Sequence, residues 1–61
     1  MTYDEAAKAC RDKAEVRFTD GPYKGAVGVA VRTLVLFGKD RIEIKDGSAT
    51  RSAPITDAEL Q

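Results

Sequence analysis

The chain has 61 residues, 43% of them hydrophobic, and its ten Lys and Arg residues are balanced by ten Asp and Glu residues. A chain this short forms a single small domain, residues 1–61, and buries only about 60% of the surface that it exposes when unfolded. Ordinary apolar content with zero net charge is typical of a globular protein and not of a disordered one. Zero net charge also excludes the strong positive field that draws basic proteins to nucleic acid.

The residue types exclude several kinds of functional site. There is one cysteine, Cys10, and there is no histidine. An intramolecular disulfide, a Cys/His zinc site and a His-dependent catalytic triad are therefore excluded, and we expect no metal, no other cofactor and no enzymatic activity. No stretch approaches the roughly 18 apolar residues of a membrane span, so we expect a cytoplasmic protein with no membrane partner.

Residues 2–14 are expected to form a helix. Thr2 and Glu5 have the spacing of a capping box, in which each side chain accepts a hydrogen bond from a free backbone N–H of the other residue. Small apolar residues recur with the helical period and predict the buried stripe. That stripe comprises Tyr3, Ala6, Ala7, Cys10 and Ala14. We expect the helix to cap one end of the remaining structure or to cover one of its faces, with Cys10 as a small buried side chain.

The period then changes to the two-residue alternation of β-strands. Residues 15–19 form a first strand, with Val16 and Phe18 facing inward. After a dense turn signal, a second strand runs to Phe37, with the valines at 27, 29 and 31 on one face and Gly28, Ala30 and Arg32 on the other.

Two further strands and a terminal turn follow. Residues 38–40 predict a chain reversal, and residues 41–45 form a strand with Ile42 and Ile44 inside. Asp46-Gly47 indicates a type I′ hairpin, and residues 48–53 form a weak strand that Pro54 should end. Residues 56–59 have a second capping-box spacing and predict a short helical turn.

These elements predict a mainly β fold. Four or five short antiparallel strands cannot form a two-sheet sandwich of ordinary size, and a small bent barrel closes its own edges. We therefore expect a small SH3-like barrel with an N-terminal α-helix and a short C-terminal helical turn.

One segment resembles a known motif. After the strand around Val16 and the turn residue Asp20 comes the sequence Gly21-Pro22-Tyr23-Lys24-Gly25-Ala26-Val27-Gly28-Val29. This pattern resembles the KOW motif of NusG-type transcription elongation factors and of several ribosomal proteins, and the resemblance covers residues 15–60.

The resemblance implies a non-catalytic binding module. Ribosomal members of that family contact ribosomal RNA through the loops around this turn, and elongation-factor members bind proteins of the transcription and translation machinery. Carried over to this sequence, Tyr23 would be an exposed aromatic contact and Lys24 a partner for phosphate or carboxylate. Arg17, on the neighbouring strand, would add positive charge on the same side.

The zero net charge is unevenly distributed along the chain. Residues 16–53 contain seven basic and four acidic residues, which gives this segment a charge of +3. Four cations occupy outward positions in the predicted strands and would form a basic face. These cations are Arg32, Arg41, Lys45 and Arg51.

Simpler structural interpretations stay open for several of these residues. Tyr23 either folds over the edge of the core or serves as an exposed contact. The outward cations either bind a ligand or form cross-strand charge pairs, each worth about 0.2–1 kcal/mol. Gly21 and Gly25 supply turn geometry, and Gly28 permits a bend or bulge in its strand.

Leu34, Leu36 and Phe37 belong to a segment that is apolar on both faces, and such a strand needs covering on both. We expect the N-terminal helix to provide the second cover. Without that cover, these residues would form an exposed patch suited to a protein partner or to a second copy of the chain.

Two functional hypotheses follow. In the first, a KOW-like module contacts RNA, the ribosome or RNA polymerase through residues 21–29 and the basic strand face. In the second, the protein is an adaptor or a small regulatory or inhibitor subunit, of the kind that phages or plasmids encode. It would use residues 34–37 and have no nucleic-acid role.

Overall fold

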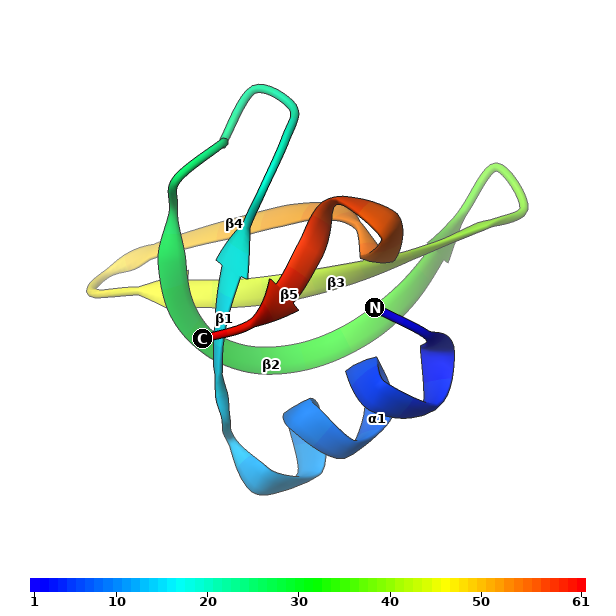
Figure 1. Ribbon diagram of the computed structural model, residues 1–61, viewed down its shortest axis with the longest axis horizontal. Coiled ribbons are helices and arrows are strands. Elements are labelled where there is room, and N and C mark those ends of the chain that lie inside the picture. Colours follow the sequence, from blue (N-terminus) through cyan, green and yellow to red (C-terminus); the bar gives the residue numbers. More distant parts are fainter.

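The computed structural model describes all residues from Met1 to Gln61 (Figure 1). It contains one α-helix, five strands and one 3-10 helix. In chain order these are α1 (Tyr3–Asp12), β1 (Glu15–Phe18), β2 (Val27–Leu36), β3 (Lys39–Asp46), β4 (Ala49–Pro54), η1 (Ile55–Asp57) and β5 (Ala58–Leu60). The expected mainly β class with an N-terminal helix and a short C-terminal helical turn is confirmed.

Helix α1 begins as the sequence predicts. The backbone N–H of Glu5 donates to Thr2 Oγ1 at 3.2 Å, and the N–H of Thr2 donates to Glu5 Oε1 at 2.8 Å, which completes the capping box. The helix ends at Lys13, whose φ of 52° lies in the left-handed region. Its N–H closes the last turn by donating to the carbonyls of Ala9 and Cys10. The helix is therefore slightly shorter than residues 2–14.

All five strands form one antiparallel sheet in the order β4-β3-β2-β1-β5. The sheet curls strongly, and β2 bends through a wide arc (Figure 1). No ladder joins the outer strands β4 and β5, so the sheet stays open where we expected a closed barrel. The 3-10 helix η1 connects those two edge strands.

Both hairpin turns lie one residue or more away from their predicted positions. The β2–β3 turn is Phe37-Gly38, closed by the pair Leu36 and Lys39, and both turn residues have positive φ, 53° and 75°. The β3–β4 turn is Gly47-Ser48, in which only Gly47 has positive φ, so Asp46 is a strand residue. A glycine at the first turn position is typical of a type II′ turn and not of the predicted type I′.

The structure divides the predicted face of Gly28, Ala30 and Arg32, because only Arg32 lies on the outer face of the sheet. Gly28 and Ala30 face the core, whereas Val29 and Val31 are 40% and 45% exposed. The register of β2 against β3 then shifts between Ala30 and Arg32, which marks a β-bulge at Val31. Alternation alone cannot say which of two apolar faces is buried, because Gly and Ala also fit a core position where another chain segment lies close.

A close approach of β2 to β3 explains why a glycine occupies position 28. A Cβ atom there would lie 2.5 Å from the backbone oxygen of Lys45 and 2.8 Å from its carbonyl carbon. Gly28 therefore allows β2 and β3 to lie close together where the sheet curls, which agrees with the bend expected at this glycine.

The core lies inside the curl of the sheet and is closed by α1, which runs below the bend of β2 in Figure 1. Its largest fully buried side chains are Phe18, Ile42, Ile44 and Val16. The helix contributes Ala6 and Ala9 to the same cluster. The predicted helical stripe was thus rotated, since Ala9 replaces Tyr3, which is half exposed.

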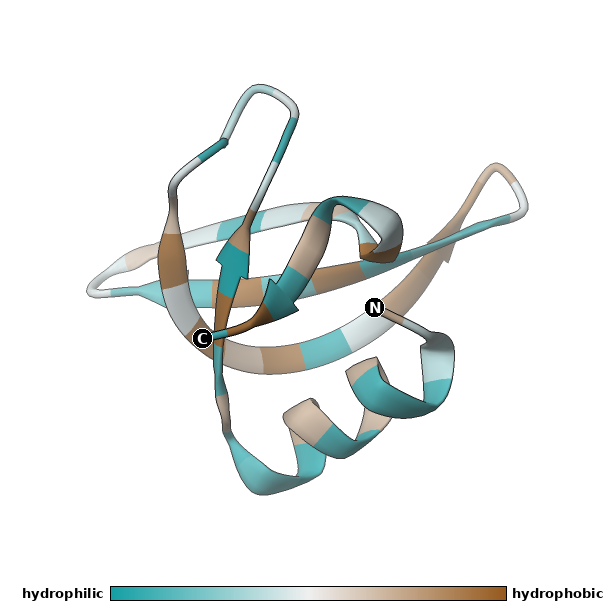
Figure 2. Cartoon of the chain, viewed as in Figure 1, coloured by the Kyte–Doolittle hydropathy of each residue, from teal (hydrophilic) through white to brown (hydrophobic).

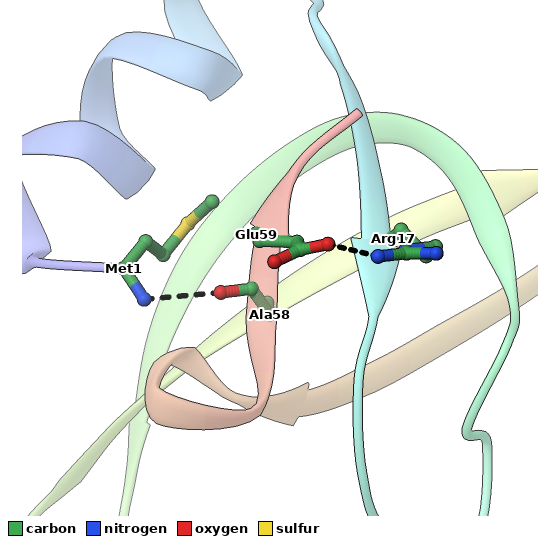
Figure 3. Close-up of polar contacts among 4 residues, drawn as sticks. All are labelled: Met1, Arg17, Ala58 and Glu59. Carbon is green, nitrogen blue, oxygen red and sulfur yellow. Dashed lines mark hydrogen bonds and ion pairs between the residues drawn. The ribbon is translucent and has the colours of Figure 1, made fainter.

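The C-terminal segment differs from the prediction in one respect. Pro54 ends β4 as expected, but η1 has no side-chain cap, so the second capping box was wrong. The chain instead continues into β5, which pairs with β1. The backbone nitrogen of Met1 donates to the carbonyls of Ile55 and Ala58 at 2.9 and 3.0 Å, which fastens the start of α1 to this segment (Figure 3).

Candidate binding surfaces

The turn between β1 and β2 is held by its own backbone. The N–H of Lys24 donates to the carbonyl of Gly21 at 3.2 Å, and the N–H of Gly25 donates to the carbonyl of Phe18 at 2.8 Å. Gly21 and Gly25 have positive φ, 85° and 89°, which supports their predicted role in turn geometry. The turn presents Tyr23 and Lys24 on the surface.

Tyr23 combines the two interpretations that the sequence left open. Its side chain is 41% exposed, and the guanidinium carbon of Arg51 lies 4.9 Å from the centroid of its ring. Arg51 pairs with the buried Ile44 across the β3–β4 ladder, so it lies on the core-facing side of β4. The expectation that Arg51 faces outward with the other cations was therefore wrong.

Arg17 and Lys24 line a shallow hollow of about 180 Å³ beside this turn, together with Phe18, Thr19 and Gly25. Arg17 also forms an ion pair with Glu59 of β5, in register across the β1–β5 ladder (Figure 3). Both partners are about half exposed, so solvent screens the pair and its net contribution to stability is small. The hollow thus brings the two predicted contact cations Arg17 and Lys24 together, and Arg17 is already paired with Glu59.

The other predicted cations lie on the outer face of β2 and β3. Arg32 Nε donates to Glu43 Oε2 at 3.1 Å, which is a cross-strand charge pair. Arg41 Nη2 donates to the carbonyl and the hydroxyl of Ser52 at 3.1 and 3.3 Å, while its Nε is buried without a partner. Lys45 is exposed and forms no ion pair. Three of the four predicted cations therefore share one face.

The β2–β3 hairpin projects beyond the body of the domain, and we call residues 34–41 the hairpin arm (Figure 1). The β2 side of the arm is hydrophobic and the β3 side is hydrophilic (Figure 2). Leu34 is partly buried, Leu36 is 47% exposed and Phe37, at the tip, is 94% exposed. The expectation that the N-terminal helix covers this segment was wrong, because α1 packs at the core end of the sheet.

The sequence did not reveal that the outer face of β2 is also apolar along the body of the domain. Val29 and Val31 face solvent there, and they continue the exposed apolar residues of the arm. The alternation of valines was visible in the sequence. Alternation does not say which of two apolar faces meets solvent.

Other parts of the chain offer little chemistry. No group of three or more His, Cys, Asp or Glu side chains is arranged to hold a metal ion. Cys10 is partly buried, and burial raises the pKa of its thiol, which opposes formation of the reactive thiolate. No helix has the length and hydrophobicity that crossing a membrane requires.

Comparisons of the chain with models of protein families, with curated proteins and with solved structures find no match.

Proposed function

We propose that this protein is a non-enzymatic binding module that docks on a protein partner through its hairpin arm. The observation that carries the proposal is Phe37, a large aromatic residue that is almost fully exposed and has positive φ. The left-handed conformation costs a non-glycine residue roughly 1–2 kcal/mol, and exposure of the ring gains nothing for folding. Neither the positive φ of Phe37 nor the exposure of its ring stabilises the isolated domain, so Phe37 is a candidate for a functional contact.

The shape of the arm supports docking on a protein. Aromatic side chains supply much of the binding energy at protein interfaces when they fill a pocket of the partner. Phe37 projects at the end of a two-stranded arm, with Leu36 beside it on β2. The arm therefore presents an anchor residue with an apolar neighbour.

Capture of proteins from a lysate of the source cells tests this proposal. Leu36→Asp should abolish the capture of a protein that the original chain retains, and nuclease treatment should leave that capture intact. Thr50→Asp, a matched change at an exposed position of β4, should retain the partner. Equal capture by both variants, with unchanged circular dichroism, would contradict docking through the arm.

A second candidate is the RNA-binding or nucleoprotein-binding role that the KOW-like resemblance implies. The stack of Arg51 on Tyr23, with Lys24 beside it, favours this role, because bases stack on aromatic and guanidinium planes. The pairing of Arg17 and Arg32 with carboxylates weakens it.

Binding to a structured RNA at two salt concentrations separates the two candidates. Contacts to phosphate release counterions, so RNA binding should weaken steeply as salt is added. The double change Tyr23→Ala and Lys24→Glu should remove such binding while leaving capture by the arm unchanged. RNA binding that resists both the salt and the double change would rule out this surface.

A further inference from the structure

The outer face of β2 and β3 combines apolar residues and cations in register. Val29 pairs with Lys45, Leu34 with Arg41 and Leu36 with Lys39 across the ladder. Paired side chains on one face of an antiparallel ladder lie about 5 Å apart, so each of these apolar residues has a cation beside it. We call these three pairs the mixed rows.

No carboxylate pairs with the cations of the mixed rows, of which Lys39 and Lys45 are exposed and Arg41 is half-buried. Neither Lys39 nor Lys45 forms an ion pair, and Arg41 is held in place by Ser52 and not by a carboxylate. The remaining row of this face, Arg32 with Glu43, neutralises itself. Three positive charges thus line one side of an apolar strip over seven residues of β3, from Lys39 to Lys45, a length of roughly 20 Å.

We infer that the partner segment is acidic and amphipathic, with apolar side chains that pack on Val29, Leu34 and Leu36. Its carboxylates would lie against Lys39, Arg41 and Lys45. This inference rests on the proposed docking function and specifies the chemistry of the partner. A helix of about 14 residues spans the rows, since each helical residue advances 1.5 Å. Phe37 extends the apolar strip at one end.

A second copy of the chain fits this face poorly. Two copies in face-to-face contact would oppose their own unpaired cations, which is unfavourable. The chain does have an acidic helical turn at Asp4 and Glu5, but α1 already buries its apolar residues Ala6 and Ala9 in its own core. That helix has no apolar face left to offer.

RNA and lipid are also poorer matches. Single-stranded RNA is recognised by stacking of several bases on aromatic or guanidinium planes. The strip itself is aliphatic, Phe37 is a single ring at its end, and the guanidinium groups of Arg32 and Arg41 are engaged by Glu43 and Ser52. Insertion into a lipid surface requires a wide apolar face, whereas the apolar side chains of this face form one narrow strip, in which Val29 is 60% covered and Leu36 about half covered by neighbours. A protein segment contacts both the strip and its cations.

Three synthetic helical peptides test the inference by fluorescence anisotropy against the full chain. Each has 16 residues and the same leucine face, and the flanking positions carry Glu, Gln or Lys. We expect the Glu peptide to bind at least about tenfold more tightly than the Gln peptide, and the Lys peptide to bind most weakly. Lys39→Glu with Lys45→Glu should reverse that order.

Lys8→Glu with Arg11→Glu is the matched control, because it changes the net charge equally at exposed positions of α1, away from the mixed rows, and should leave the order unchanged. Equal binding of all three peptides, lost in Leu36→Asp, would overturn the acidic partner and leave the docking function standing. The acidic partner would also be overturned if none of the three peptides bound, or if the control variant reversed their order. Tighter binding of a single-stranded RNA or of anionic vesicles through Lys39 and Lys45 would overturn it as well. The lysate experiment would then decide the docking function separately.

Discussion

The guanidinium group of Arg51 lies over the ring of Tyr23, although 28 residues separate them in the sequence. The contact joins the β1–β2 turn to the edge strand β4. It therefore fastens the long turn to the edge of an open sheet. It also offers a flat, positively charged surface beside Lys24.

This stack makes a measurable contribution to stability. We expect Tyr23→Ala and Arg51→Ala each to lower the free energy of unfolding, with a coupling of about 0.5–1 kcal/mol between them, the usual value for an exposed cation–π pair. A double-mutant cycle followed by urea unfolding measures that coupling. Lys24→Ala in place of Arg51→Ala should show no coupling with Tyr23→Ala. Additive effects of Tyr23→Ala and Arg51→Ala would contradict the stack.

The hairpin tip should be stabilised by removing the residue that we assign to function. Phe37→Asn should raise the free energy of unfolding by about 1 kcal/mol, because Asn tolerates positive φ and Asn-Gly is preferred in type I′ turns. The same change should weaken partner capture. Urea unfolding gives the stability difference. Phe37→Ala is the control, since alanine removes the ring but keeps the unfavourable φ, and it should change stability little. A destabilised Asn variant would mean that the ring stabilises the fold.

Gly28 should tolerate no side chain. Gly28→Ala should cost about 1–3 kcal/mol, because the added methyl group overlaps the backbone of Lys45 and forces the strands apart. Thermal unfolding of the variant measures the loss. Thr50→Ala, at an exposed position of β4, should change the free energy by less than about 0.5 kcal/mol. If Gly28→Ala left the free energy of unfolding unchanged, β2 and β3 would separate easily at this position.

The capping box should make the stability of the helix depend on pH. The hydrogen bond from the Thr2 backbone, followed by that from the Thr2 side chain, lowers the pKa of Glu5 below its usual 4.5. The folded state therefore favours ionised Glu5, and the resulting stability is present above pH 4.5 and is lost as the pH falls through the lowered pKa.

Thermal unfolding of the original chain and of Glu5→Gln across this pH range measures the effect. The original chain should lose stability relative to the Gln variant as the pH falls below 4.5. In a Thr2→Ala background the two should respond alike, because the partner of Glu5 is gone. A pH-dependent difference that survives Thr2→Ala would assign the effect to another group.

The sequence predicted those elements whose signals are local. The capping box of Thr2 and Glu5, the alternation of Val16 and Phe18, and the inward Ile42 and Ile44 were all correct. Each depends on residues close in sequence, whose pattern has one physical interpretation.

The misplaced features depend on contacts between distant segments. The bulge that separates Arg32 from the face of Gly28 and Ala30 was not predicted, because the sequence cannot show that Gly28 must lie against the backbone of Lys45. The inward position of Arg51 and the lack of helix cover over Phe37 were missed for the same reason. Strand β5 was missed because its three residues become a strand only by pairing with β1.

For the candidate site, the sequence grouped Arg32, Arg41 and Lys45 on one face, but Arg32 shares that face only because the bulge at Val31 interrupts the alternation after Ala30. It did not place an apolar strip beside them, because that arrangement results from the bulge and from the register of β2 against β3. The combined surface could be recognised only in three dimensions.

The β-bulge at Val31 has a further consequence for how this chain can change. The residue that it inserts separates two halves of β2, one that builds the core through Gly28 and Ala30 and one that carries the arm. Substitutions in the arm need not satisfy the packing of the interior, so the tip can be exchanged while the body is retained. The body of the domain is in this sense a scaffold, and the hairpin arm, residues 34–41, can be exchanged to give it new partner specificities.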